Sequence, residues 1–202
     1  ADRAAAALRR GLENALSLKG KAVPNEGGLV WRFMGGAARI KRRIPLSEEV
    51  ITRFDQMDIS AEVLKAIDKM GFKEPSTVQA KTIPLMMSGV DIMAIAPTGT
   101  GKTCAFGIPM LEYMDLKDRR IQEVVLCPTR ELAVQIGEEL TKLAAFIPEV
   151  RIAVLYGGQP IVKQLNALKR NPQIIIATPG RLLDHMNRGN LRLDAVHTMV
   201  LD

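Results

Sequence analysis

Hydrophobic and polar positions alternate in two ways from residue 51 to the end of the chain. Short apolar runs typical of buried strands are separated by segments with apolar residues every three or four positions, the spacing of an amphipathic helix. The predicted strands are Ile92–Ala96, Glu123–Cys127, Arg151–Tyr156, Gln173–Ala177 and Thr198–Leu201. Helical patterns begin near Gly101, Arg130, Pro160 and Pro179, and two precede the first strand, at Ser60–Met70 (with Ser60 as cap) and Thr77–Met87. This alternation predicts an α/β fold, a parallel sheet with helices on both faces, in which ligands bind at the carboxyl ends of the strands.

The first fifty residues have a different pattern. Leu8, Leu12 and Leu16 recur every four residues and predict a helix over residues 2–20, and apolar runs at residues 29–34 and 37–44 are predicted to pair as a hairpin. Residues 1–50 hold 10 Lys or Arg against 5 Asp or Glu, whereas residues 51–202 hold 18 against 17. We therefore divide the chain into a basic N-terminal extension of unassigned role, residues 1–50, and a domain, residues 51–202.

Composition excludes several classes of protein. The chain is 47% apolar and 25% charged, which is the composition of a globular protein and not of a disordered one. No apolar run reaches the roughly 18–20 residues that a membrane span needs. Cys104 and Cys127 lack metal-ligand spacing, so we interpret them as reduced, buried thiols of a cytoplasmic protein.

A phosphate-binding loop is the first candidate site. After the strand Ile92–Ala96 the chain reads Ala-Pro-Thr-Gly-Thr-Gly-Lys-Thr, and a helical pattern begins. Glycines let backbone N–H groups approach a polyphosphate, and the N-terminus of the helix adds its positive dipole. In this pattern the lysine reaches the β- and γ-phosphates and the last hydroxyl holds Mg²⁺. The loop residues are Thr98, Gly99, Thr100, Gly101, Lys102 and Thr103. A Gly- and Thr-rich surface turn is the alternative, and Ala96 stands where the general pattern has Gly.

Five further motifs occur in a fixed order around this loop. Phe54 lies 17 residues before the segment Gly-Phe-Lys-Glu-Pro-Ser-Thr-Val-Gln, which ends at Gln79. Later segments are Pro128-Thr129-Arg130-Glu131-Leu132, Gly157-Gly158, Thr178-Pro179-Gly180-Arg181 and the terminal Val200-Leu201-Asp202. With these motifs, residues 51–202 resemble the first RecA-like domain of the DEAD-box RNA helicases, whose Q motif, motif I, motif Ia, GG motif, motif Ib and the start of motif II they match in order. Pro97 departs from the family, which usually has Gln there.

The resemblance implies an ATP-dependent RNA helicase with ATP and Mg²⁺ as cofactors. Gln79 is expected to bond the N6 and N7 edge of adenine and Phe54 to lie against its ring. Lys102, Thr103 and Asp202 are the expected catalytic residues, and Thr103 and Asp202 hold Mg²⁺, the latter through water. Taken alone, Gln79 also suits a helix surface and Phe54 a core aromatic.

The motifs after the three middle strands are expected to bind RNA through its backbone, without reading its sequence. The few aromatic residues in residues 51–202 argue against stacking platforms for bases. The expected contacts are Pro128, Thr129, Arg130, Gly157, Gly158, Thr178, Pro179, Gly180 and Arg181. Surface charges at helix starts and a simple glycine turn are the alternatives.

The resemblance also implies that the chain is truncated. The acid that follows Asp202 in the family and the second RecA-like domain, with its arginine fingers, are expected partners in catalysis, so we expect no ATP turnover from these 202 residues alone. Two other readings stay open: a non-catalytic interaction module that uses the basic extension, and a DNA-directed motor, which the RNA-helicase-like motifs disfavour.

One strand of the related domains has no counterpart after residue 202. That strand lies between the strands of motif I and motif II, so residues 198–201 are expected to border a slot with unpaired backbone groups. Either another segment fills the slot, such as the hairpin of residues 29–44, or the chain is only marginally stable. We expect marginal stability.

Overall fold

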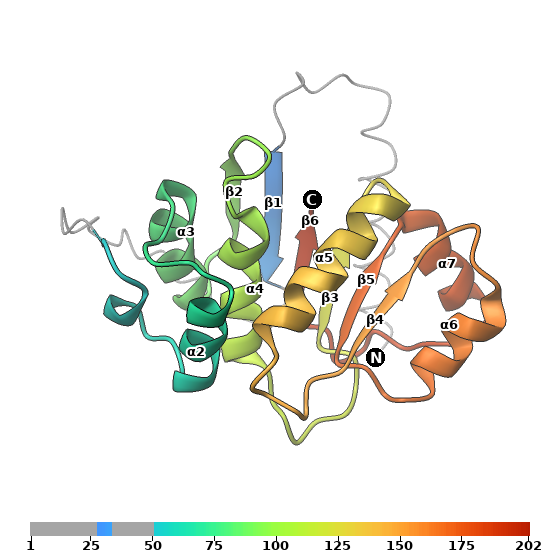
Figure 1. The fold of residues 1–202 in the computed structure, drawn as a ribbon. Coiled ribbons are helices and arrows are strands. Elements are labelled where there is room, and N and C mark those ends of the chain that lie inside the picture. The colour runs from blue at the N-terminus through green and yellow to red at the C-terminus, as the bar shows by residue number, and fades with distance from the viewer. Residues whose placement is uncertain (1–27, 34–50) are drawn as a thin grey trace.

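The computed structural model describes residues 28–33 and 51–202, and within them it has one sheet in the order β2-β1-β6-β3-β5-β4. Figure 1 shows its strands side by side. The strands are β1 (Gly28–Phe33), β2 (Ile92–Ile95), β3 (Glu123–Leu126), β4 (Ile152–Leu155), β5 (Ile174–Ala177) and β6 (Thr198–Leu201). The predicted helix over residues 2–20 and the apolar run at residues 37–44 lie outside the described residues.

The five strands predicted after residue 51 all form and all run in the same direction. β3 pairs in parallel with β5 and β6, and β4 pairs in parallel with β5. β1 is antiparallel to both of its neighbours, β2 and β6, so those two strands also run parallel to each other. The carboxyl ends of β2 to β6 therefore meet at one edge of the sheet, here called the carboxyl edge; the other is the amino edge.

β1 fills the slot that was expected beside β6. Val30 pairs with Met93 of β2 on one side and with Leu201 of β6 on the other (Figure 1). The expected hairpin between residues 29–34 and 37–44 is therefore wrong, because both edges of β1 are occupied by these strands. Filling of the slot by another segment is confirmed. Marginal stability stays a prediction, but the unpaired backbone groups that were its physical reason are gone.

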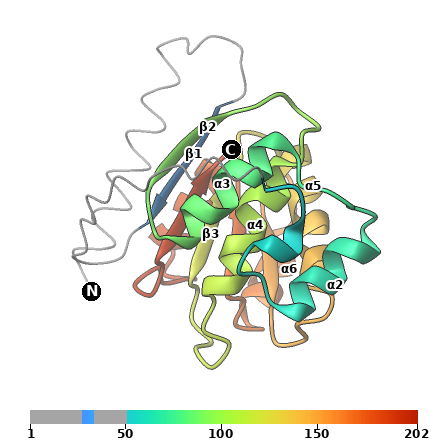
Figure 2. The ribbon, with the colours of Figure 1, turned by 90° about the vertical axis from the view of Figure 1, so that its left-hand side faces the viewer.

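Seven helical segments were found in the described residues, and they cover the two faces of the sheet. They are the 3₁₀ turn η2 (Phe54–Gln56), α2 (Ala61–Lys69), α3 (Thr77–Met87), α4 (Lys102–Tyr113), α5 (Arg130–Leu143), α6 (Ile161–Leu168) and α7 (Pro179–Asn187). Helices α2 to α5 share one core cluster, in which Phe106 and Leu140 are fully buried, and Figure 2 shows them on the same side of the sheet. A second cluster on the other face includes Leu182 of α7 and Leu191 and Leu193 of the segment before β6.

Most helices begin where the pattern predicts. α5 begins at Arg130, and the Thr129 hydroxyl accepts a hydrogen bond from Leu132 N at 3.2 Å, which satisfies one of the free N–H groups of the first turn. Ser60 occupies the position before α2, as predicted, but its hydroxyl donates to Glu112 Oε1 at 2.7 Å and caps no N–H group of the helix. That contact ties the start of α2 to α4.

None of the helices that the structure describes is long and apolar enough to cross a bilayer.

Candidate functional site

The loop at residues 96–101 connects β2 to α4 at the carboxyl edge. Gly99 and Gly101 both have a backbone φ of +80°, a left-handed conformation that residues with a side chain rarely adopt. A Cβ on Gly101 would also lie 2.3 Å from Gln79 Nε2, so glycine is required there for space as well. The Thr100 hydroxyl donates to the Pro97 carbonyl at 2.8 Å. The loop therefore has a defined bend, and Lys102 opens the helix that follows it.

The start of α3 is bonded directly to this loop. Ser76 Oγ donates to the Thr100 carbonyl at 2.8 Å, and Gln79 Nε2 donates to the Gly101 carbonyl at 3.0 Å. Gln79 Oε1 accepts from Ser76 N at 2.9 Å, which completes a capping box. An amide has two N–H donors and two acceptor positions. Gln79 therefore retains one donor and one acceptor beyond these bonds, as many as the predicted pair with adenine needs.

A cavity of about 1120 Å³ lies beside the loop. Its lining includes residues 98–103, Gln79 and Asp202, which the motifs predicted as one site from distant positions in the sequence. Phe54 is not in the lining: it is 5% exposed and belongs to the core cluster under α2 and α4. Phe72, 37% exposed, is an aromatic ring that does line the cavity. The ring predicted to lie against adenine is therefore packed in the core, and Phe72 is the one that borders the cavity.

Three acidic side chains and three lysines line this cavity: Glu74, Glu139 and Asp202, with Lys69, Lys102 and Lys142. Burial raises the pKa of Asp202 above its ordinary value, with Lys102 opposing the shift and Glu139 adding to it. Glu139, on α5, also lines the cavity, although no motif singled it out. A cation placed near these groups would lower the pKa of Asp202 and favour its carboxylate form.

The lining suits Mg²⁺ bound mainly by phosphate oxygens and water. Thr103 supplies a hydroxyl and Asp202 a carboxylate, the hard oxygen ligands that Mg²⁺ prefers. No group of three or more His, Cys, Asp or Glu side chains capable of holding a metal occurs among the residues that the structure describes. Mg²⁺ usually keeps several waters and shares substrate phosphates, so such a group is not required.

Both cysteines are free and buried, as predicted. Burial raises the pKa of Cys104 to about 12, with the charge of Glu139 adding to the shift. Burial likewise raises the pKa of Cys127 to about 12, with Asp202 adding to it. Thiolates are the reactive form of cysteine, so neither side chain is suited to nucleophilic chemistry. Cys104 borders the cavity as a packing residue.

The three other predicted segments lie next to one another along the carboxyl edge. Arg130, at the start of α5, lies over the ring of Tyr156 at 5.9 Å and would be 3.8 Å from a Cβ on Gly158. Arg181, in the first turn of α7, donates to the Gln159 carbonyl at 3.4 Å. The turn after β4 therefore lies between the two arginines. Arg130, Gly157, Gly158 and Gly180 are exposed there, so the backbone and the charges are open to a ligand.

The structure thus brings together nearly all of the predicted site residues. Residues 98–103, Gln79 and Asp202 share one cavity, which Pro128 also borders, and the arginines and glycines form a row beside it. Phe54 is the residue left out. Phe72 lies within the predicted segment that ends at Gln79 but was given no role there. No motif includes Gln135 or Glu139, which only packing places at the cavity.

Comparison with known proteins agrees with this arrangement. The profile of the family described as DEAD/DEAH box helicase matches residues 76–202. A protein named DEAD-box ATP-dependent RNA helicase CshA, from Geobacillus kaustophilus, is 52% identical over 152 residues, which are 75% of this chain and 32% of that protein. One named ATP-dependent RNA helicase CshA, from Listeria monocytogenes, is 47% identical over 152 residues, 75% of this chain and 29% of that protein. The chain spans about a third of the length of these relatives.

A solved structure shares the fold. The crystal structure of a DEAD box protein from the hyperthermophile Methanococcus jannaschii superposes with a TM-score of 0.63 at 38% identity, over 72% of this chain and 39% of that chain.

Proposed function

The chain belongs to the DEAD/DEAH box helicase family, and we propose that it is the ATP- and RNA-binding part of an ATP-dependent RNA helicase. The observation that carries this proposal is the cavity that joins the phosphate loop, Gln79 and Asp202, with the arginine and glycine row beside it on the same edge. The relatives named above are called ATP-dependent RNA helicases. We place the protein in the cytoplasm, which is where free cysteines persist.

In this proposal the loop binds the phosphates of ATP. Backbone N–H groups of residues 98–103 and the N-terminus of α4 face the negative charge, and Lys102 neutralises part of it. Thr103 would hold Mg²⁺ directly and Asp202 would hold it through water, and the ion would supply positive charge next to the phosphates. Gln79 links the predicted adenine contact to the loop, because its amide lines the cavity and is bonded to the Gly101 carbonyl.

RNA lies along the row of Arg130, the GG turn and Arg181. Arginine pairs with phosphate through two parallel N–H groups, and exposed glycines let a strand approach the backbone closely. Such contacts fix the position of a strand without reading bases. Unwinding or remodelling of RNA by the whole protein requires the second RecA-like domain that the family resemblance implies. We expect these 202 residues alone to bind both ligands without turning over ATP.

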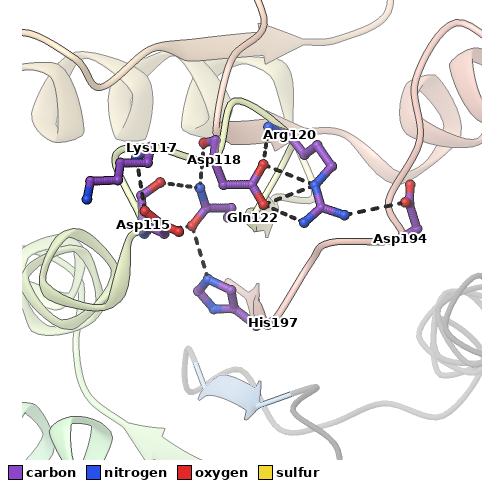
Figure 3. Close-up of polar contacts among 7 residues, drawn as sticks. All are labelled: Asp115, Lys117, Asp118, Arg120, Gln122, Asp194 and His197. Carbon is purple, nitrogen blue, oxygen red and sulfur yellow. Dashed lines mark hydrogen bonds and ion pairs between the residues drawn. The ribbon is translucent and has the colours of Figure 1, made fainter.

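Titration of fluorescent ADP with Mg²⁺ tests the nucleotide half of the proposal. Replacing Lys102 by Ala removes a charge-assisted contact and is expected to weaken binding about 10- to 100-fold. Lys117→Ala is the matched control, because it removes the same charge from an exposed position at the amino edge and should leave binding unchanged (Figure 3). Equal affinities for all three proteins, or no binding by the unmodified chain, would favour the interaction module instead.

Binding of a fluorescent single-stranded RNA tests the other half. Arg130→Ala and Arg181→Ala are each expected to weaken binding for RNAs of any sequence and to reduce the slope of log affinity against log salt by about one. A DNA strand of the same sequence separates the RNA helicase from a DNA-directed motor, since the 2′-hydroxyl distinguishes the two.

A further inference from the structure

A buried amide lies directly beneath the row that is proposed to bind RNA. Gln164, on α6, is 1% exposed, and no motif includes it. Its Nε2 donates to the Tyr156 carbonyl at 2.8 Å, and its Oε1 lies 3.4 Å from Arg181 Nη1 and 2.9 Å from His185 Nε2. One side chain thus touches the strand end that leads into the GG turn and the arginine of motif Ib.

Chemistry fixes the orientation of this amide. Arginine can only donate hydrogen bonds, so the group facing Arg181 must be the oxygen of Gln164. A backbone carbonyl can only accept, so the group facing Tyr156 must be the nitrogen. Turning the amide over would place two donors against each other at Arg181 and two acceptors at Tyr156.

The same logic fixes the tautomer of His185, which is 0% exposed. Its Nε2 meets an acceptor, the oxygen of Gln164, and therefore carries the proton. Its Nδ1 lies 3.2 Å from Asn190 Nδ2 and accepts from that amide. Burial, with the nearby Arg181, lowers the pKa of His185 and keeps the ring neutral. Asn190, His185 and Gln164 form a chain of hydrogen bonds in one direction, ending at the Tyr156 carbonyl.

We propose that Gln164 is a positioning residue for RNA: it holds the GG turn and Arg181 at a fixed separation, and His185 orients its amide. The inference rests on the proposed RNA binding at this row. Two contacts bind a common strand well only when their spacing matches that of the phosphates, so rigid spacing adds affinity that flexible loops lose. Arg181 is bonded to the turn directly, through the Gln159 carbonyl at 3.4 Å, and Gln164 adds a second link. The oxygen of Gln164 accepts from Arg181 at 3.4 Å, and its nitrogen donates to the Tyr156 carbonyl at 2.8 Å.

The amino edge offers a matched control for a buried glutamine. Gln122 is 2% exposed, and its Nε2 donates to the carbonyls of Asp115 and Asp118, both at 2.8 Å. Its Oε1 accepts from Asp115 N at 2.9 Å and lies 3.4 Å from His197 Nε2 (Figure 3). Gln122 therefore has the same chemistry as Gln164, including a histidine partner, at the edge farthest from the RNA row.

The test compares Gln164→Leu with Gln122→Leu in RNA binding, nucleotide binding and thermal unfolding. Each variant leaves buried polar groups unpaired, which costs about 1–3 kcal/mol, so both should lower the melting temperature. We expect Gln164→Leu alone to weaken RNA binding, by about tenfold or more, with nucleotide affinity within about twofold of the original. Unchanged RNA affinity in Gln164→Leu, or an equal loss in Gln122→Leu, would overturn the inference.

Gln164→Glu covers the case in which the leucine variant does not fold. The carboxylate keeps an acceptor for Arg181 and His185 but opposes the Tyr156 carbonyl with an oxygen. The link to the GG turn is therefore lost, while the contact with Arg181 is kept as an ion pair. A weaker loss of RNA affinity, about three- to tenfold, is expected, and none would contradict the proposal. Arg181→Ala distinguishes failure of the proposed RNA site from failure of this inference. If Arg181→Ala also leaves RNA binding unchanged, the proposed RNA site is wrong. If Arg181→Ala weakens RNA binding and neither Gln164 variant does, only the inference about Gln164 is wrong.

Discussion

Both edges of the sheet contain a buried glutamine next to a histidine, but the two pairs stabilise different kinds of loop. At each edge a buried glutamine, with a histidine beside it, bonds to the backbone of connecting loops: Gln122 with His197 and Gln164 with His185. At the amino edge these bonds hold the connection between α4 and β3 (Figure 3). At the carboxyl edge they hold a glycine turn and an arginine open to solvent. A buried amide network therefore does not by itself mark a functional site; what it holds in place does.

Both edges of the sheet hold ion-paired and unpaired cations. At the amino edge Arg120 is bonded to Asp118 at 3.0 Å and lies 3.9 Å from Asp194, which also pairs with Arg192 at 3.4 Å. At the carboxyl edge Arg130 pairs with Glu131 at 3.3 Å. In the part of the chain that the structure describes, Lys102 and Arg181 have no ion pair with an acidic side chain within 4.0 Å, and neither do Lys117 and Arg119 at the amino edge. Paired charges cancel at a distance, whereas unpaired cations at a glycine-rich edge attract a polyanion. Lys102 and Arg181 differ from the unpaired cations of the amino edge in their position, because Lys102 lines the cavity and Arg181 lies next to the exposed Gly180.

The largest expected effect is a loss of nucleotide affinity, caused by a substitution that fills the space between the phosphate loop and α3. Gly101→Ala places a Cβ 2.3 Å from Gln79 Nε2 at a φ of +80°, so the loop and Gln79 must move apart. Fluorescent ADP binding is expected to weaken at least tenfold. Gly89→Ala is the control: φ is +75° there, but nothing lies within 4 Å of the added Cβ, so it bears similar backbone strain without the clash. Equal nucleotide affinity in both variants would show that the contact with Gln79 does not shape the site.

Replacing a buried glutamate at the amino edge is expected to stabilise the folded protein. Glu123, at the start of β3, is fully buried, and burial raises its pKa well above the ordinary value, which the Thr198 hydroxyl offsets only in part. Above the ordinary carboxyl pKa of about 4.3, Glu123 ionises in the unfolded chain but stays protonated in the folded chain. The free energy of unfolding therefore falls as pH rises towards the folded-state pKa of Glu123. Glu123→Gln should raise the free energy of unfolding at pH 8 and have much less effect near pH 4.

Thermal unfolding at both pH values measures this difference. Each kcal/mol corresponds to about 2–4 °C in melting temperature for a chain of this size. Glu138→Gln, at an exposed position of α5, is the matched control and should leave the melting temperature unchanged. His197 Nδ1 lies 3.5 Å from Glu123 Oε1, and a strong bond between them would reverse the prediction, because the glutamine variant would then be the less stable protein.

The smallest expected effect is a pH dependence of the way Mg²⁺ strengthens ADP binding. Because burial raises the pKa of Asp202, the carboxylate that Mg²⁺ needs forms only as pH rises from about 4 through that raised pKa. We expect Mg²⁺ to strengthen ADP binding by a few-fold more at pH 8 than at pH 5. Phosphate groups titrate in the same range, so Asp202→Asn is compared with the original protein at each pH. A Mg²⁺ effect with the same pH dependence in both would exclude Asp202 as the titrating group.

Local patterns determined most of the elements and the motifs of the site. The strand prediction at Thr198–Leu201 and the helix prediction at Thr77–Met87 match the observed bounds, because apolar runs and 3.6-residue periodicity reflect which face of each element is buried. Residues 98–103, Gln79 and Asp202 were predicted as one site from separate motifs, and they line one cavity because strands that run in parallel bring their carboxyl ends together.

Only the tertiary structure decided which surfaces and strands meet. β1 was expected to pair with the residues that follow it, yet it pairs with β2 and β6, whose backbone groups would otherwise be unpaired within the sheet. Phe54 was expected at the nucleotide and lies in the core, while Phe72 and Glu139 reach the cavity and Gln164 connects two motifs from beneath. Pairing and burial depend on the free energy of the whole packed chain, and a residue's own neighbours in sequence do not encode them.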